Sequence, residues 1–196
     1  MQMINAKCRH IDAILITHKH YDHIGGLDDV RGLNYTMHCP ISVYAEQLHA
    51  DGIMHMFPYV FEKNKYPGAP NITLNIIDEE PFEINGIKIE PIRVMHAKMP
   101  ILGYKIDNWA YITDSSYIPE ESMEKLKNLD VLVLDALRHE PHMSHFSIKQ
   151  ALEVVEKLQP QRTFFTHINH DFGNYAEYNH KLPQGVEMAY DGLVVE

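Results

Sequence analysis

Hydrophobic positions along the chain fall into short apolar runs that alternate with segments of helical spacing. Most runs are continuous rather than alternating, which is typical of strands covered on both faces. They predict strands at residues 11–17, 40–45, 87–94, 103–106, 109–113, 131–135, 162–166 and 187–195. Helical spacing predicts helices at residues 27–34, 119–129 and 147–158.

Residues 147–158 carry the clearest helical pattern. Ser147 is expected at the N-cap, Gln150 completes a capping box, and Pro160 lies beyond the end. The apolar stripe consists of Ile148, Ala151, Leu152, Val155 and Leu158. Strands that alternate with such helices predict an α/β protein in which helices cover the sheets.

Length and composition narrow the class of protein. A chain of 196 residues can bury the core of one domain, so a single domain over residues 1–196 is predicted. The net charge of -10 argues against nucleic acid and anionic membranes as partners. Cys8 and Cys39 form no CxxC motif, which fits a reducing cytoplasm, and neither a secretion signal nor a membrane span is recognised.

Histidine is the unusual residue type, with fourteen copies. The segment LITHKHYDHIGG, residues 15–26, places three of them and an aspartate within six positions after an apolar run. His18 and His20 are two apart and converge only on extended backbone, so a loop leaving a strand is predicted. Gly25 and Gly26 then allow a tight turn.

Five of the predicted strands end in a residue that can bind a metal. These residues are His18, His96, Asp114, Asp135 and His167. Strand ends hold side chains rigidly at the surface, so distant residues can meet in one cleft. Imidazole and carboxylate groups without thiolates indicate a catalytic Zn²⁺, Mn²⁺ or Fe site. Asp135 is expected to orient a ligand histidine.

The predicted ligands exceed the needs of one tetrahedral ion, so two divalent ions, Zn²⁺ or Mn²⁺, are expected. The ligand set is His18, His20, Asp22, His23, His96, Asp114 and His167.

The segment THKHYDH resembles the HxHxDH motif of the metallo-β-lactamase fold superfamily, and the later ligands follow in that superfamily's order. The surrounding segments GYKIDNWAYITDSSYIPEE, LDALRHEPHMSHFSIKQALE and THINHDFG resemble the branch of phosphoribosyl cyclic phosphate phosphodiesterases. The resemblance implies a four-layer α/β/β/α sandwich. It also implies one ion on His18, His20 and His96, another on Asp22, His23 and His167, and Asp114 as the bridge.

Members of this branch carry additional strands and a glycine-rich segment before the HxHxDH strand. Only about 17 residues precede His18 here, so the domain is expected to lack those strands. A strand edge left open in this way invites pairing with another chain, and a homodimer is therefore a candidate assembly.

The ligand set predicts metal-assisted hydrolysis. Two ions about 3.5–4 Å apart activate a bridging water and clamp the oxygens of a phosphodiester. A small phosphodiester, with a cyclic one as an option, is the expected substrate. Asp22 and Asp114 are expected to act in catalysis as well as in binding, and the resemblance implies that His145 contacts the phosphate or protonates the leaving oxygen. His142 and His170 are alternatives to His145.

Other functions stay open. Relatives that process RNA 3′ ends share HxHxDH, although the acidic balance and the lack of a basic arm count against that activity. A non-catalytic, metal-stabilised binding or assembly protein is the alternative outside enzymes. β-Lactam hydrolysis is disfavoured without a secretion signal, and oxygen-reducing di-iron relatives carry Glu at the position of His20.

The Met-, Phe- and Tyr-rich residues 48–70 favour core or dimer packing over a substrate-shaping flap. The remaining histidines are interpreted as structural or solvent-facing. They are His10, His38, His49, His55, His139 and His180.

Overall fold

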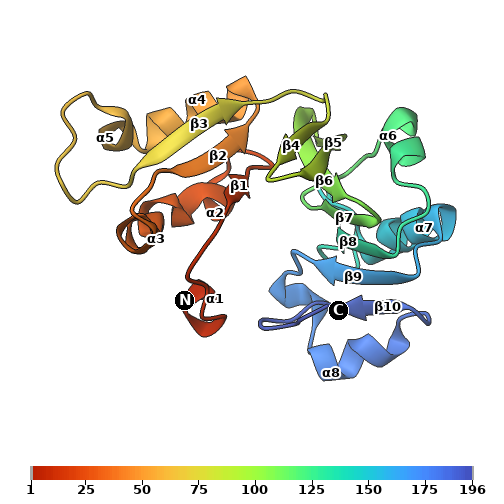
Figure 1. Cartoon of the computed structure of the whole chain (residues 1–196). Coiled ribbons are helices and arrows are strands. Elements are labelled where there is room, and N and C mark those ends of the chain that lie inside the picture. The colour runs from red at the N-terminus through yellow and green to blue at the C-terminus, as the bar shows by residue number, and fades with distance from the viewer. Residues whose placement is uncertain (1, 196) are drawn as a thin grey trace. The chain divides into compact units, whose positions relative to one another are not determined.

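A computed structural model describes residues 2–195, with the side chain of residue 2 left out of the description. The chain divides into two compact units, Met1–Gly86 and Ile87–Glu196, which run from red to yellow-green and from green to blue in Figure 1. Each unit has a sheet and helices of its own. The single domain over residues 1–196 stays a prediction.

The first unit contains a parallel three-stranded sheet of order β1-β2-β3. Its strands are β1 (Ala13–Leu15), β2 (Ile41–Ala45) and β3 (Ile72–Ile76). In the central strand β2, Ile41, Val43 and Ala45 are buried and alternate with partly exposed residues. This period of two fits a strand with one face in a core.

Helices supply the rest of the core in the first unit. They are α1 (Gln2–Asn5), α2 (Tyr21–Ile24), η1 (Gly25–Val30), α3 (Arg31–Met37), α4 (Gln47–Met56) and α5 (Pro58–Phe61). Leu27 of η1 and Ile53 of α4 join the buried cluster that contains β2. Phe57 and Val60 belong to the same cluster, so part of the 48–70 segment has the packing role expected of it. A short strand, β4 (Phe82–Ile84), ends this unit.

The strands of the second unit follow the order β10-β9-β8-β7-β6-β5. They are β5 (Ile87–His96), β6 (Met99–Ile106), β7 (Trp109–Ile112), β8 (Val131–Asp135), β9 (Arg162–Thr166) and β10 (Val186–Met188). Pairing is antiparallel from β5 to β7 and parallel from β7 to β10. The carboxyl ends of β7, β8 and β9 therefore lie at one edge, where polar side chains can gather.

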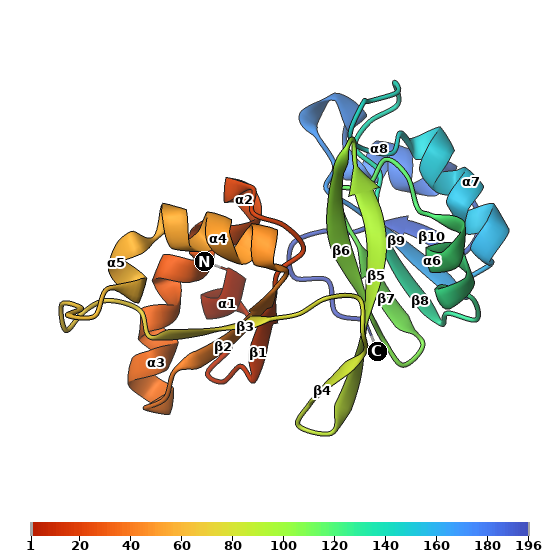
Figure 2. The same ribbon diagram turned by 90° about the horizontal axis from the view of Figure 1, so that it is seen from above.

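Two helices, α6 (Glu120–Lys125) and α7 (Ile148–Leu158), pack on this sheet through one hydrophobic cluster (Figure 2). The predicted capping box is present, since the Gln150 backbone donates to Ser147 Oγ at 3.4 Å and the Ser147 backbone donates to Gln150 Oε1 at 3.0 Å. Short helical turns follow β9, namely η2 (His170–Phe172), α8 (Tyr175–Tyr178) and η3 (Asn179–Lys181).

Several predicted elements differ from the structure. The strands β3 and β4 and the helix α4 were not predicted, and the strand predicted at 187–195 is limited to Val186–Met188. The predicted helix 27–34 is a 3₁₀ turn followed by α3, which extends to Met37. In α4, apolar side chains such as Leu48 and Met54 are exposed, which blurs the helical period.

Among residues 2–195, no helix is both long enough and apolar enough to cross a membrane.

Candidate metal centre

The HxHxDH segment leaves β1 as extended chain and then forms a helical turn. The backbone of His20 is extended, with φ -64° and ψ 147°, and this residue is the N-cap of α2. Asp22 and His23 lie on the turn itself. The prediction of a loop leaving a strand is confirmed for His18 and His20, and the helix brings the next two donors back toward them.

Four possible ligands gather within the first unit. The Nε2 atom of His18 lies 3.0 Å from Nδ1 of His20, and the ring centroid of His18 lies 4.2 Å from that of His23. Nε2 of His23 is 3.3 Å from a carboxylate oxygen of Asp22. Two ring nitrogens that face each other at 3.0 Å need a shared proton or a cation between them. This donor set therefore fits a divalent metal.

The ring of His18 is held by its neighbours. His18 is fully buried, and its Nδ1 lies 3.1 Å from the hydroxyl of Thr17. This bond fixes the ring so that Nε2 is the nitrogen that faces His20. His49 of α4 is also fully buried, with its ring centroid 6.4 Å from that of His18. Of the two roles expected for His49, the structural one fits this position.

A second set of donors belongs entirely to the second unit. His96 is the last residue of β5, and its Nδ1 donates to the backbone carbonyl of Asp114 at 2.8 Å. Because a carbonyl oxygen only accepts, Nδ1 carries the proton and the neutral ring presents Nε2 as its lone-pair nitrogen. A metal ligand held by a backbone carbonyl in this way is a common arrangement.

Asp114 lies between His96 and His167. It is buried, its Oδ1 accepts from Thr113 Oγ1 at 2.9 Å, and the same oxygen lies 3.2 Å from Nε2 of His167. Its Oδ2 lies 4.0 Å from Nδ1 of His96. The buried Asp114 carboxylate is therefore placed beside a predicted ligand histidine, as a role in metal binding requires.

Two of these donors sit on unfavourable backbone. Asp114 has φ 54° and His167 has φ 55°, both in the left-handed region. Residues with a Cβ adopt this region at a cost, and such residues cluster at functional sites. The backbone at both positions turns sharply just after the strands β7 and β9 end.

His145 occupies the space beside the donors of the second unit. Its ring centroid lies 4.9 Å from that of His96 and 5.0 Å from that of His167, with the latter ring nearly parallel at 15°. The side chain is buried. His145 is therefore placed among the predicted ligands of its own unit, as its predicted role requires.

Asp135 contacts His145 and none of the predicted ligand histidines among its described contacts. Its Oδ2 lies 3.5 Å from His145 Nδ1, while Oδ1 accepts from the backbone and hydroxyl of Ser115 at 2.9 and 2.8 Å. Burial raises the pKa of Asp135 above its usual range, and the bonds with His145 and Ser115 oppose that shift. Asp135 was predicted to orient a histidine that binds metal. The histidine that it faces is His145, which is not among the predicted ligands, so that part of the prediction was wrong.

The two alternatives to His145, namely His142 and His170, have different surroundings in the structure. The ring of His142 lies 5.1 Å from that of His145. His170 is exposed and pairs with Asp171 at 3.3 Å.

The hydroxyl groups of Thr113 and Ser115, which donate hydrogen bonds to Asp114 and Asp135, were not predicted. The run TDSS after a predicted strand is the signal that could have indicated them.

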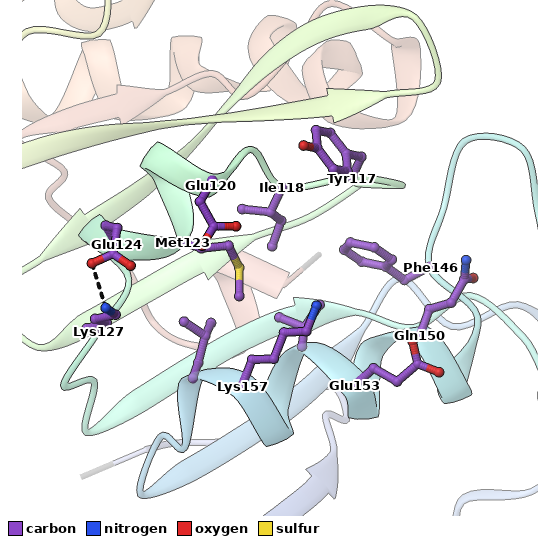
Figure 3. A pocket seen from close by; sticks show the side chains of 12 residues that line it. Tyr117, Ile118, Glu120, Met123, Glu124, Lys127, Phe146, Gln150, Glu153 and Lys157 are labelled. Carbon is purple, nitrogen blue, oxygen red and sulfur yellow. Dashed lines mark hydrogen bonds and ion pairs between the residues drawn. The ribbon is translucent and has the colours of Figure 1, made fainter.

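A cavity of about 500 Å³ lies between α6 and α7 (Figure 3). Ile118 and Phe146 are buried at its apolar side, whereas Glu120, Glu153 and Lys157 carry its charge. None of the seven predicted ligands lines it. Its position therefore gives no support for a role in the predicted chemistry.

Comparison with known proteins places this arrangement in context. The profile of the beta-lactamase superfamily domain matches residues 2–168. The crystal structure of a diphosphatase from the PhnP family is 39% identical, with a TM-score of 0.90, and the match covers 97% of this chain and 72% of that one. Human tRNase Z, short form, has a TM-score of 0.65 at 20% identity over 95% of this chain and 79% of that one, which is a likeness of fold alone.

An octanoyltransferase of Porphyromonas gingivalis is 39% identical over 185 residues. The match covers 93% of this chain but only 37% of the length of that relative. Most of the relative therefore lies outside the region that the two proteins share.

Proposed function

Because this chain belongs to the beta-lactamase superfamily and to the PhnP family within it, we propose that it is a hydrolase of small phosphodiesters that uses two divalent ions, Zn²⁺ or Mn²⁺. The α/β metallo-β-lactamase fold expected from the sequence is confirmed by the same relationships. The observation that carries the proposal is the buried carboxylate of Asp114, whose Oδ1 lies 3.2 Å from Nε2 of His167.

The ligands of this proposal come from both halves of the chain. One ion would be held by His18, His20 and His96, the other by Asp22, His23 and His167, and Asp114 would serve both. When bound, such ions lower the pKa of water toward neutrality and neutralise the charge of a phosphodiester. Asp22 would also offset part of the positive charge of the ions.

His145 is proposed as the proton donor to the leaving oxygen. Its Nδ1 faces the Asp135 carboxylate, which leaves Nε2 as the nitrogen available to a substrate. A general acid must present its proton to the leaving oxygen, and Nε2 is the nitrogen in a position to do so. The ring of His145 packs against those of His96 and His167, which are two of the proposed ligands.

The relatives favour phosphorus chemistry over the other candidates. A diphosphatase shares 39% identity over nearly the whole chain, so cleavage of a diphosphate is a second candidate within the same mechanism. The name octanoyltransferase belongs to a protein of which this chain matches 37%, so acyl transfer is not carried over. The likeness to tRNase Z concerns the fold, and the net charge of -10 still argues against an RNA substrate.

The test combines metal analysis with turnover of bis(p-nitrophenyl) phosphate. We expect two ions per chain, hydrolysis that depends on Mn²⁺ or Zn²⁺, and loss of both after Asp114→Ala. His145→Ala should lower turnover about 100-fold while the metal content stays the same. The proposal would be contradicted if the purified protein held no metal and if added metal did not accelerate hydrolysis of the phosphodiester. Bound metal with no turnover would favour the binding or assembly alternative.

A further inference from the structure

A loop of the second unit carries His142 and His145 and is closed at its base. The backbone N–H of Leu137 donates to the carbonyl of Phe146 at 2.9 Å, and that of Ile148 donates to Arg138 at 3.0 Å. Phe146 also donates to the carbonyl of Ser115 at 2.7 Å, which ties the loop to the segment that follows Asp114. The loop is thus anchored to the same backbone that positions a proposed ligand.

Inside the loop, the side chain of Arg138 braces the chain just before His142. Its Nε donates to the carbonyl of Glu140 at 3.3 Å, and a terminal nitrogen donates to that of Pro141 at 3.1 Å. One guanidinium that holds two successive carbonyls limits the motion of this stretch. Arg138 therefore holds the backbone immediately before His142.

The proton position of His142 follows from its neighbours. Its Nδ1 is 3.3 Å from both the backbone nitrogen and the hydroxyl of Ser144. Because a backbone N–H only donates, Nδ1 accepts, and the neutral ring carries its proton on Nε2. Among residues 2–195, Nε2 has no hydrogen-bond partner. Burial lowers the pKa of His142, and the nearby His145, Arg138 and His96 lower it further.

His142 lies one ring beyond His145, counted from the proposed ligands. Its centroid is 5.1 Å from that of His145, whereas His145 itself contacts the rings of His96 and His167. In a diphosphate, two phosphoryl groups are joined through one bridging oxygen and so lie side by side. Two neighbouring donors on one braced loop match two neighbouring phosphoryl groups.

We propose that His142 is a substrate-positioning residue that donates an Nε2–H hydrogen bond to the second phosphoryl group of a diphosphate diester. This rests on the proposed function, since it names a substrate class for the same site. Water attacks the first phosphorus and loses a proton to solvent, while the bond from that phosphorus to the bridging oxygen breaks. His145 gives its proton to that oxygen and takes up another from solvent afterwards. The products are two phosphate monoesters, and His142 stays neutral throughout.

The experiment compares two substrates. Di(adenosine-5′) diphosphate has a second phosphoryl group, and bis(p-nitrophenyl) phosphate lacks one. His142→Ala should lower kcat/KM about 10- to 100-fold for the diphosphate and less than about threefold for the phosphodiester, because one hydrogen bond to a charged group is lost. His142→Gln, which keeps an N–H donor, should recover a large part of the difference.

His139→Ala is the matched control on the same loop. Its ring contacts Phe172 and Tyr178 rather than His145, so neither substrate should respond. Metal content and melting temperature establish that each variant is folded. Equal losses on both substrates, no loss on the diphosphate, or a wild-type enzyme that cleaves only the phosphodiester would overturn the inference and leave the proposed function intact. A wild-type protein that cleaves neither would overturn both.

Discussion

At the residue scale, Asp135 determines which nitrogen of His145 carries a proton toward the protein interior. Its Oδ2 faces His145 Nδ1 at 3.5 Å, and its other oxygen is held by Ser115. A carboxylate accepts only, so it selects the ring form with a proton on Nδ1. An amide at this position can present an N–H instead and reverse that selection.

Asp135→Asn should therefore lower turnover of a phosphodiester about 10- to 100-fold with little change in metal content. Steady-state kinetics with metal analysis checks this. The control is Asp107→Asn, an exposed aspartate at φ 51°, a backbone conformation that asparagine tolerates. Full activity in the Asp135 variant would mean that His145 does not depend on this carboxylate.

Tyr59 gives a residue-scale prediction about stability. Its hydroxyl donates to the carboxylate of Asp28, and this hydrogen bond is the main cause that raises the pKa of Tyr59 from 10.0 to about 12. The folded state holds the proton more tightly than the unfolded chain. The stabilisation is therefore complete below pH 10 and is lost as the pH rises toward 12.

Tyr59→Phe should lower the free energy of unfolding by about 1 kcal/mol at pH 8. The difference between the two proteins should shrink at pH 11, because the wild type alone loses its contribution there. Urea denaturation at both pH values measures this. A difference that grows with pH would contradict the assignment of the hydrogen bond.

At the scale of elements, the close contact of β6 with β7 depends on Gly103. A Cβ at this position would lie 2.3 Å from Cδ1 of Ile112 and 2.8 Å from the carbonyl oxygen of Tyr111. Backbone cannot move aside as a flexible side chain can. The strand β7 leads directly to Asp114, so a shift here reaches a proposed ligand.

Gly103→Ala should destabilise the protein by about 1–3 kcal/mol and weaken metal retention. Gly32→Ala in α3 is the control, because a Cβ there has nothing within 4 Å. This second change should be neutral or stabilising by up to about 1 kcal/mol, since alanine favours a helix. Urea denaturation of both variants separates a local clash from a general effect of replacing glycine.

The sequence predicts elements well where one local signal dominates. The helix at 147–158 was recovered almost to the residue, because Ser147, Gln150 and the apolar stripe agree. The strand β3 was missed because Thr73 and Asn75 interrupt its apolar residues. Whether such a segment forms a strand depends on its pairing with neighbouring strands, which lie far away in the sequence. A window of a few residues does not contain that information.

At the scale of the whole molecule, the candidate metal ligands were predicted from the polar residues that follow predicted strands. His96, Asp114 and His167 follow apolar runs, and the structure brings them together within the second unit. The partner of Asp135 could not be predicted in this way. It depends on a loop that returns His145 to the strand ends after ten residues, and only tertiary contacts specify that return.

Metal binding should also contribute to the stability of the whole chain. Under the proposed function, ions bind the folded state alone, so free metal at 1,000 times the dissociation constant adds about 4 kcal/mol. A chelator should therefore lower the melting temperature of the metal-loaded protein, and added Zn²⁺ or Mn²⁺ should restore it. Asp114→Ala should not respond to either treatment, whereas His10→Ala should behave as the wild type does.

The left-handed backbone at Asp114 and His167 has a consequence for evolution under selection for heat resistance. This conformation costs a histidine about 1–2 kcal/mol and an aspartate less, and glycine would relieve the cost at both positions. Variants chosen only because they survive heating, without any demand for turnover, should therefore drift toward glycine at these two sites. Such a lineage would become more robust as an apoprotein while it discards the groups that give the molecule its chemistry.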